Sequence, residues 1–380
     1  MFIHPYFDAE NFVNKRPGKQ LNLFNLKTEL LCKGVKVENS IEKGRKYGAG
    51  PAGGRYLILP NNSVVNVPLW PPFVNKSDIV LRGFDSNWSL LKNGDKIADV
   101  ELITAPKFYS RKTKSGHSMC KIALLHGKDC LATTLLQKCV HWSNGNVCKF
   151  CGIELSLKNN STVLRKKPSD LVEVVGAAVE ESVCRHITLT TGTPSTPDRG
   201  AKIFAKVTKE IKNHYEVPIH VQLEPPEEKY LELLADAGVD TVGIHIENFD
   251  RIILNQVCPG KAKVSFEEYL SSWRKAVELF GEAQVSTYVI AGLGEKDESI
   301  FKGVETVAGL GVIPFLVAFR PIIGTEFENR SPPSARRMIL LYEEVVEILH
   351  DYNLDPSKNL AGCVRCGACS SILEAFMCKG

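Results

Sequence analysis

The feature that most constrains the fold is an alternation of short and long apolar patterns that begins near residue 120. Six short runs rich in β-branched residues are typical of buried strands, and the stretches between them have the apolar spacing of amphipathic helices. The predicted strands are 130–136, 187–191, 219–223, 241–246, 285–291 and 314–319. This order predicts an α/β fold, a partial (β/α)6 TIM-like barrel with its chemistry at the C-terminal ends of the strands.

The segments on either side lack this pattern, so we expect three parts. Residues 1–105 are rich in Gly, Pro and Asn and carry short alternating runs, which predict a small N-terminal β-rich region. Residues 106–335 contain the partial barrel. Residues 336–380 contain a C-terminal helix and an extension with a group of cysteines.

Composition excludes several classes of protein. The 380 residues are 44% apolar and 24% charged, which is ordinary for a globular chain and unlike a disordered one. A net charge of +4 is too balanced to indicate a nucleic-acid or membrane surface as partner. No apolar run reaches the roughly 18 residues of a membrane span, and no secretory signal is visible, so we expect a cytoplasmic protein.

Three of the 12 cysteines follow the first predicted strand closely. Cys139, Cys148 and Cys151 have the spacing C-x8-C-x2-C. Three thiolates can hold three irons of a [4Fe-4S] cluster and leave the fourth iron open for another ligand. Zinc is an alternative, with His141 as a fourth ligand, and a chance grouping of inert cysteines is a third interpretation.

This cysteine loop resembles that of radical S-adenosylmethionine (SAM) enzymes. These enzymes have a C-x3-C-x2-C loop after the first strand of a partial (β/α)6 barrel, with an aromatic residue before the last cysteine. Phe150 occupies the aromatic position, whereas the first gap is widened from three residues to eight. The resemblance covers roughly residues 106–335 and implies the cluster, SAM and a barrel fold.

Glycine motifs in the family's order strengthen the resemblance. Thr190-Thr191-Gly192-Thr193 looks like the motif that meets the SAM amino group, and Val289–Glu295 looks like the adenine-contacting element on the fifth strand. The segment 320–328 is similar to a stretch of biotin-synthase-like members. The SAM-binding residues that we expect are Thr191, Gly192, Thr193, Glu247, Gly292, Gly294 and Arg320.

Each of these residues has a structural alternative. The glycines are also common turn residues at strand ends, and Glu295 suits the start of a helix. His245 and Glu247 share one face of the fourth strand, so they either meet SAM or substrate or form a structural pair. Arg320 binds either a carboxylate of SAM or substrate, or a structural acid.

The second group of cysteines is Cys363, Cys366 and Cys369, with the spacing C-x2-C-x2-C. It matches the first three cysteines of the bacterial ferredoxin motif. At the position of the fourth cysteine of that motif, this chain has Leu373. We predict an auxiliary iron–sulfur cluster, with zinc and redox-active thiols as alternatives. Cys378 is the nearest fourth ligand, and Ser370, Cys32 or a bound substrate could replace it. Cysteines 120, 130, 184 and 258 suit core packing.

The resemblance implies a radical SAM enzyme that cleaves SAM reductively to a 5′-deoxyadenosyl radical. This radical takes hydrogen from a small or carrier-bound substrate, with an electron from reduced flavodoxin or ferredoxin. The second cysteine group and the biotin-synthase-like segment favour sulfur insertion from the auxiliary cluster, as in biotin and lipoyl synthases. Rearrangement and carbon–carbon bond formation are alternatives within the family. A zinc-binding interaction module is the alternative of another class.

Overall fold

A computed structural model describes residues 22–38, 41, 45, 48, 53–84 and 87–379. Its larger sheet has seven strands in the order β13-β12-β11-β10-β9-β8-β7. The strands are β7 (Leu124–His126), β8 (Cys130–Thr134), β9 (His186–Thr190), β10 (Ile219–Leu223), β11 (Thr241–Ile244), β12 (Val285–Ala291) and β13 (Val312–Ala318). Strands β8 to β13 pair in parallel, and β7 adds an antiparallel edge that the sequence did not predict. The six predicted strands and the partial barrel are therefore confirmed.

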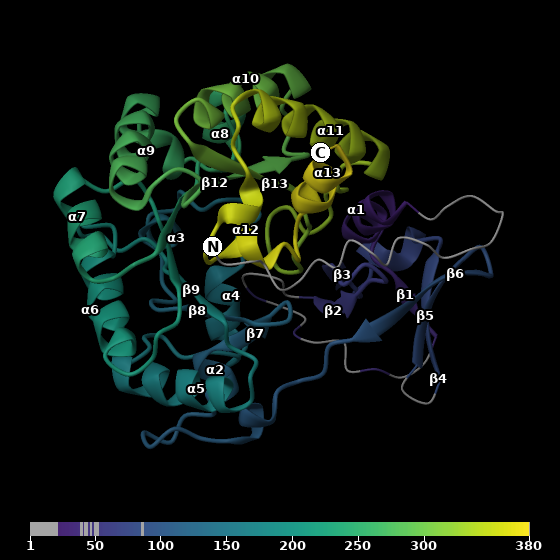
Figure 1. Ribbon diagram of the computed structural model, residues 1–380, viewed down its shortest axis with the longest axis horizontal. Coiled ribbons are helices and arrows are strands. Elements are labelled where there is room, and N and C mark those ends of the chain that lie inside the picture. Colours follow the sequence, from purple (N-terminus) through teal and green to yellow (C-terminus); the bar gives the residue numbers. More distant parts are fainter. Residues whose placement is uncertain are drawn as a thin grey trace.

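Helices follow the strands and cover the outer side of the sheet, in an arc that Figure 1 shows around the strands. They are α2 (Met119–Ile122), α3 (Val140–Ser143), α4 (Ile153–Lys158), α5 (Pro168–Glu180), α6 (Ala201–Lys212), α7 (Glu228–Asp236), α8 (Arg251–Val257), α9 (Phe266–Phe280), α10 (Asp297–Ala308) and α11 (Ala335–Asp351). Helix α9 begins with the capping box that its sequence predicts, in which Ser265 and Glu268 bond each other's backbone.

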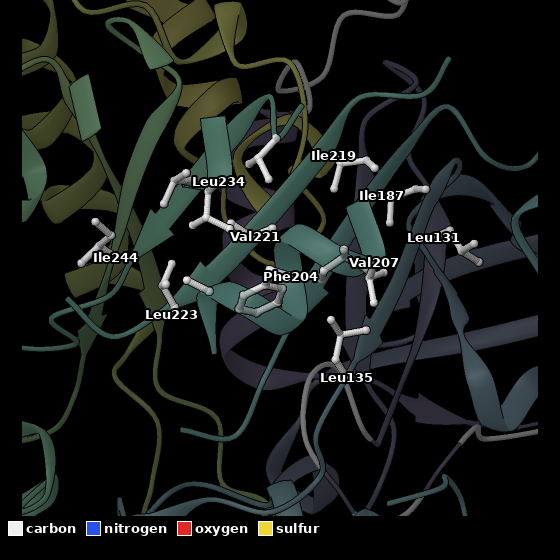
Figure 2. Packing of buried hydrophobic residues seen from close by; sticks show 14 of the residues in the cluster. Leu131, Leu135, Ile187, Phe204, Val207, Ile219, Val221, Leu223, Leu234 and Ile244 are labelled. Atoms are coloured by element: carbon white, nitrogen blue, oxygen red, sulfur yellow. The ribbon is translucent and has the colours of Figure 1, made fainter. Parts of the chain in front are cut away.

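Strand residues alternate between the outer core and the barrel interior because side chains project from opposite faces of a strand. Figure 2 shows Leu131, Ile187 and Val221 packed with Phe204 and Val207 of α6. Burial of each such side chain stabilises the fold by about 1.5–3 kcal/mol. The alternate residues of the same strands are largely polar and face the interior, where the barrel can bind a ligand.

The N-terminal part contains α1 (Leu23–Lys33) and a six-stranded sheet in the order β1-β4-β5-β6-β2-β3. Its strands are β1 (Lys36–Val37), β2 (Gly54–Ile58), β3 (Val64–Pro68), β4 (Ile79–Phe84), β5 (Asn87–Lys92) and β6 (Asp95–Leu102). Helix α1 was not predicted. It begins at Asn22, whose side chain accepts a hydrogen bond from the Asn25 amide, and it contacts α11 and α13 as well as β3.

The C-terminal extension folds back under the barrel as α12 (Cys363–Cys366) and α13 (Ile372–Lys379), drawn in yellow in Figure 1. The Gly362 amide donates to His186 at the start of β9, and Thr241 at the start of β11 donates to the Ala361 carbonyl. The extension therefore lies at the N-terminal ends of the strands. No helix in the described ranges has the length and apolar character that a membrane span requires.

Candidate functional site

The first cysteine group lies on the loop between β8 and α4, at the C-terminal end of the strands. Cys139 immediately precedes α3, and the Cys151 amide donates to the Cys148 carbonyl, which makes a tight turn between these two residues. Cys148 acts electrostatically on both Cys139 and Cys151, and Cys139 also acts on Cys151. The fold thus gathers the three cysteines that the sequence grouped, and all three remain partly exposed.

The pKa of each of the three thiols is raised above its ordinary value. Burial raises the pKa of Cys139, and burial next to Cys148 raises the pKa of Cys151 to about 12. The pKa of Cys148 is raised by its hydrogen bond to Cys258, and then by burial. Metal ions that bind thiolates would displace the thiol protons. Sequence reasoning assigned Cys258 to the core, and no local spacing links it to Cys148.

The loop after β9 supports the cysteine loop. The Val140 amide donates to the Thr193 carbonyl, and the Gly192 amide donates to the Leu136 carbonyl. A Cβ at Gly192 would overlap with the Lys138 carbonyl oxygen and lie 3.0 Å from the Cys139 nitrogen. Gly192 is therefore required by close backbone approach, beside the first cysteine.

A buried carboxylate anchors the same loop from β10. Glu224 accepts a 2.8 Å hydrogen bond from Thr193, and its Oε1 lies 2.6 Å from His141 Nε2. Burial alone would raise its pKa, but the hydrogen bond to His141 and the charge of Lys261 bring the pKa of Glu224 below its usual value. Glu224 was not among the predicted site residues, and its position at the end of β10 is the signal that points to this role.

His245 and Glu247, which follow β11, do not pair with each other. Glu247 forms an ion pair with Lys261, and it has a positive φ of 68°, which is uncommon for a non-glycine residue. His245 stacks on Tyr288 with ring centroids 4.2 Å apart, and its Nδ1 accepts from the Tyr288 amide at 3.2 Å. Its Nε2 is buried without a hydrogen-bond partner among the described residues, so this nitrogen is available to a ligand in the interior.

The loop after β12 is held by Glu295. Its carboxylate accepts from the amides of Gly292 and Leu293 at 2.8 Å and from Arg337 at 2.8 Å. Gly292 and Gly294 both have positive φ, 103° and 117°, which glycine adopts without strain. Glu295 thus shapes the glycine loop and uses both carboxylate oxygens within the protein.

Arg320 lies with the second cysteine group and not with the first. Its guanidinium donates to the side-chain and main-chain oxygens of Asn66, the latter at 2.7 Å. The charge of Arg320 lowers the pKa of Cys369, whereas burial raises that pKa by a larger amount.

Cys378, the fourth ligand that the sequence suggested, is exposed on α13. Cys363, Cys366 and Cys369 are partly exposed and act on one another electrostatically. Within the described ranges, no three His, Cys, Asp or Glu side chains are arranged to hold a metal ion.

Comparison with known proteins finds a family match for the central part of the chain. A model of the radical SAM superfamily matches residues 141–306, which include the cysteine loop from His141 onward and the strands β9 to β12. Residues 141–306 thus match the radical SAM superfamily. The three-cysteine loop therefore lies where this match begins.

Two curated relatives support the radical SAM assignment. The chain is 22% identical over 354 residues to the bacteriochlorophyllide c C-7(1)-hydroxylase of Chlorobaculum limnaeum, covering 86% of this chain and 85% of the hydroxylase. It is 28% identical over 220 residues to the biotin synthase of Persephonella marina, covering 57% of this chain and 61% of that enzyme.

Two solved structures match this chain over about two thirds of its length at low sequence identity. Methylornithine synthase matches with a TM-score of 0.47 at 17% identity, over 66% of this chain and 70% of that one. The FeFe-hydrogenase maturase of Carboxydothermus hydrogenoformans also matches with a TM-score of 0.47, at 20% identity, over 60% of this chain and 53% of that one.

Proposed function

We propose that this chain is an enzyme that uses a [4Fe-4S] cluster and SAM to abstract hydrogen from a substrate. The observation that carries the proposal is the gathering of Cys139, Cys148 and Cys151 at the C-terminal end of the strands of a radical SAM domain. Thiolates are the ligands of iron–sulfur clusters, so the donor set fits. When bound, the cluster and SAM supply the radical chemistry, with an electron from flavodoxin or ferredoxin.

The chain's own residues bind and orient these groups. We assign Thr191, Gly192 and Thr193 to SAM binding, because the backbone of Gly192 and of Thr193 contacts the cysteine loop directly. Gly292 and Gly294 give the β12 loop the conformation in which backbone can approach a ligand closely. Glu247 contributes a carboxylate beside the same end of the barrel.

The substrate is a small or carrier-bound molecule that enters the polar interior. His245 Nε2 and His220 Nε2 are buried there without hydrogen-bond partners among the described residues. Both nitrogens point toward Gly243, where an added Cβ would lie about 3 Å from each. A substrate with polar groups would satisfy these nitrogens, since unpaired buried polar atoms cost free energy.

Two candidate reactions differ in what happens to the substrate after hydrogen abstraction. The biotin synthase relative and the second cysteine group favour sulfur insertion. The relative that matches 86% of this chain is named as a hydroxylase, which favours a reaction at carbon that does not insert sulfur. Rearrangement and carbon–carbon bond formation are also reactions that do not insert sulfur. Reconstitution with 34S-sulfide separates the candidates, because only sulfur insertion transfers the label to product.

The proposal is tested by anaerobic reconstitution, followed by dithionite and SAM and an assay for 5′-deoxyadenosine. Wild-type protein should form 5′-deoxyadenosine, and Cys148→Ala should lose this activity by at least about 100-fold, because an iron then lacks its thiolate. Cys120→Ala is the matched control, since Cys120 bonds Ser118 outside the site. Full activity of Cys148→Ala, or a zinc-loaded protein without SAM cleavage, would overturn the proposal.

A further inference from the structure

Cys130 is the first residue of β8 and projects into the barrel, away from the outer core. Its neighbour Leu131 packs in that outer core, so the alternation of the strand directs Cys130 inward. Its thiol lies 3.3 Å from Thr188 of β9, and the pKa of Cys130 is raised by burial and then by the neighbouring Cys366. A cysteine of the first barrel strand therefore lies next to the C-terminal cysteine group.

Cys363 and Cys369, the other two cysteines of this group, both interact with Cys366. Cys363 accepts a 3.5 Å hydrogen bond from Gln222 of β10, and it interacts electrostatically with Cys366 and Cys369. Cys366 Sγ lies so close to Gly127 that a Cβ there would be 2.9 Å from the sulfur. The four thiols thus come from β8 and from the loop around α12, and electrostatic interactions link all four.

The backbone of this loop is fixed by several elements of the fold. Ala361 and Gly362 bond the strand starts, as described above, and the Asn66 amide of β3 donates to the Ala368 carbonyl at 2.7 Å. Lys27 of α1 donates to the Gly367 carbonyl at 3.0 Å. Such anchoring holds the thiols in place without depending on a disulfide, since all four are free.

Two cations lie beside these thiols. Lys27 is buried, and it pairs with Glu374 at 2.7 Å while its charge also acts on Cys366 and Cys369. Arg320 donates to Asn66, and none of the carboxylates in the described part of the chain forms an ion pair with it. Because a charge removed from water needs a counter-charge, this cation indicates an anionic group near Cys369.

The other proposed fourth ligands are in worse positions than Cys130. Cys378 is exposed on α13, and Ser370 uses its hydroxyl to donate to the Leu316 carbonyl at 2.6 Å. Cys32 packs with the apolar core of α11. A cavity of about 490 Å³ borders Cys366, which provides an entry path for iron and sulfide.

We propose that Cys130, Cys363, Cys366 and Cys369 together hold a second iron–sulfur cluster through four thiolates. In a four-iron cluster each thiolate binds a separate iron, so four cysteines leave no iron open to substrate. Lys27 and Arg320 offset the negative charge of the ligands. This inference holds for any reaction of the first site, and it favours a cluster that carries electrons or fixes the C-terminal extension.

The experiment isolates the second site. In the variant Cys139→Ala/Cys148→Ala/Cys151→Ala, the first site cannot bind a cluster, so failure of the proposed function does not affect the result. After anaerobic reconstitution this variant should hold about four irons and four sulfides per chain. Adding Cys130→Ala should lower the iron content at least twofold or give the electron paramagnetic resonance signal of a three-iron cluster.

Cys184→Ala in the same background is the matched control, because Cys184 is also buried and precedes a barrel strand. It should keep the iron content of its parent. Cys130→Ser keeps a side chain of similar size and replaces the thiolate with a weaker oxygen ligand. This variant should retain iron with an altered electron paramagnetic resonance signal, and circular dichroism should show that the chain is folded. The proposal is overturned if the triple variant holds no iron or holds zinc, or if Cys130→Ala keeps four irons with an unchanged spectrum.

Discussion

The imidazole of His141 and the carboxylate of Glu224 lie 2.6 Å apart and join the first cysteine loop to the end of β10. Thr193 donates to the same carboxylate oxygen, so one buried acid links the loops that follow three successive strands. A hydrogen bond to a buried ionised group is among the stronger ones, at roughly 1.5–3 kcal/mol. Glu224 therefore positions the loop that carries Cys139.

Glu224→Gln should destabilise this junction. The amide keeps the size of the side chain, but it removes the negative charge, and we expect a loss of about 1–3 kcal/mol in the free energy of unfolding. Urea unfolding measures the loss, and reconstituted iron content should fall with it. Glu232→Gln is the control, because Glu232 is half exposed and pairs with Lys275 on the surface. Equal stability of the two variants would contradict this role of Glu224.

Gly192→Ala should displace the cysteine loop, because the new methyl group would overlap with the backbone at Lys138 and Cys139. We expect destabilisation of about 1–3 kcal/mol, comparable to overpacking a core, together with lower iron retention. Gly145→Ala in the same loop meets nothing within 4 Å, so only the strain of its positive φ, about 1 kcal/mol, applies. Iron content and thermal unfolding are measured for both variants. A larger effect at Gly145 than at Gly192 would refute the steric explanation.

His220 predicts acid sensitivity of the barrel. Burial, followed by the charge of His186, lowers the pKa of His220 to about 3, whereas an unfolded histidine titrates near 6.5. Below about pH 6.5 the unfolded state therefore binds the proton first, and stability falls by up to about 1.4 kcal/mol per pH unit until the folded pKa is reached.

His220→Asn should remove this share of the pH dependence. Between pH 7.5 and pH 5, we expect the variant to lose about 2 kcal/mol less unfolding free energy than the wild-type protein. His214→Asn is the control, because His214 is exposed. Urea unfolding at the two pH values measures the difference, and parallel pH profiles for wild type and His220→Asn would contradict the prediction.

Arg320→Gln should weaken iron retention at the second cysteine group. The neutral amide can still bond Asn66, but it no longer offsets the charge of the thiolate at Cys369. In the background that lacks the first site, we expect at least twofold faster loss of iron to a chelator. Arg111→Gln is the control, since Arg111 pairs with Glu180 at an exposed position. Identical rates for both variants would exclude a role of Arg320 in charge balance.

Much of the barrel could be predicted from the sequence because its signals are local. Runs 219–223 and 285–291 became β10 and β12 with the predicted bounds, since they are rich in the β-branched residues that favour strands. The first cysteine group was likewise found from spacing alone, and the fold gathers Cys148 and Cys151 in one turn.

Other features depend on contacts that no local pattern records. Helix α1 is stabilised by α11 and α13 from the other end of the chain, and the region around it was predicted only as β-rich. Arg320 was assigned to SAM, yet it lies beside Cys369 and Asn66. Cys130 was assigned to the core because a lone cysteine in a strand carries no spacing signal.

The sequence by itself determined the alternating elements, the family and the three-cysteine loop, because periodicity and short spacing act within a few residues. Only the tertiary structure decided which distant groups meet. Cys130 and Cys366 are separated by more than half of the chain, and they touch because α12 lies at the N-terminal ends of the strands. Chain folding sets such pairings through burial and backbone hydrogen bonding over the whole domain, which a local pattern does not encode.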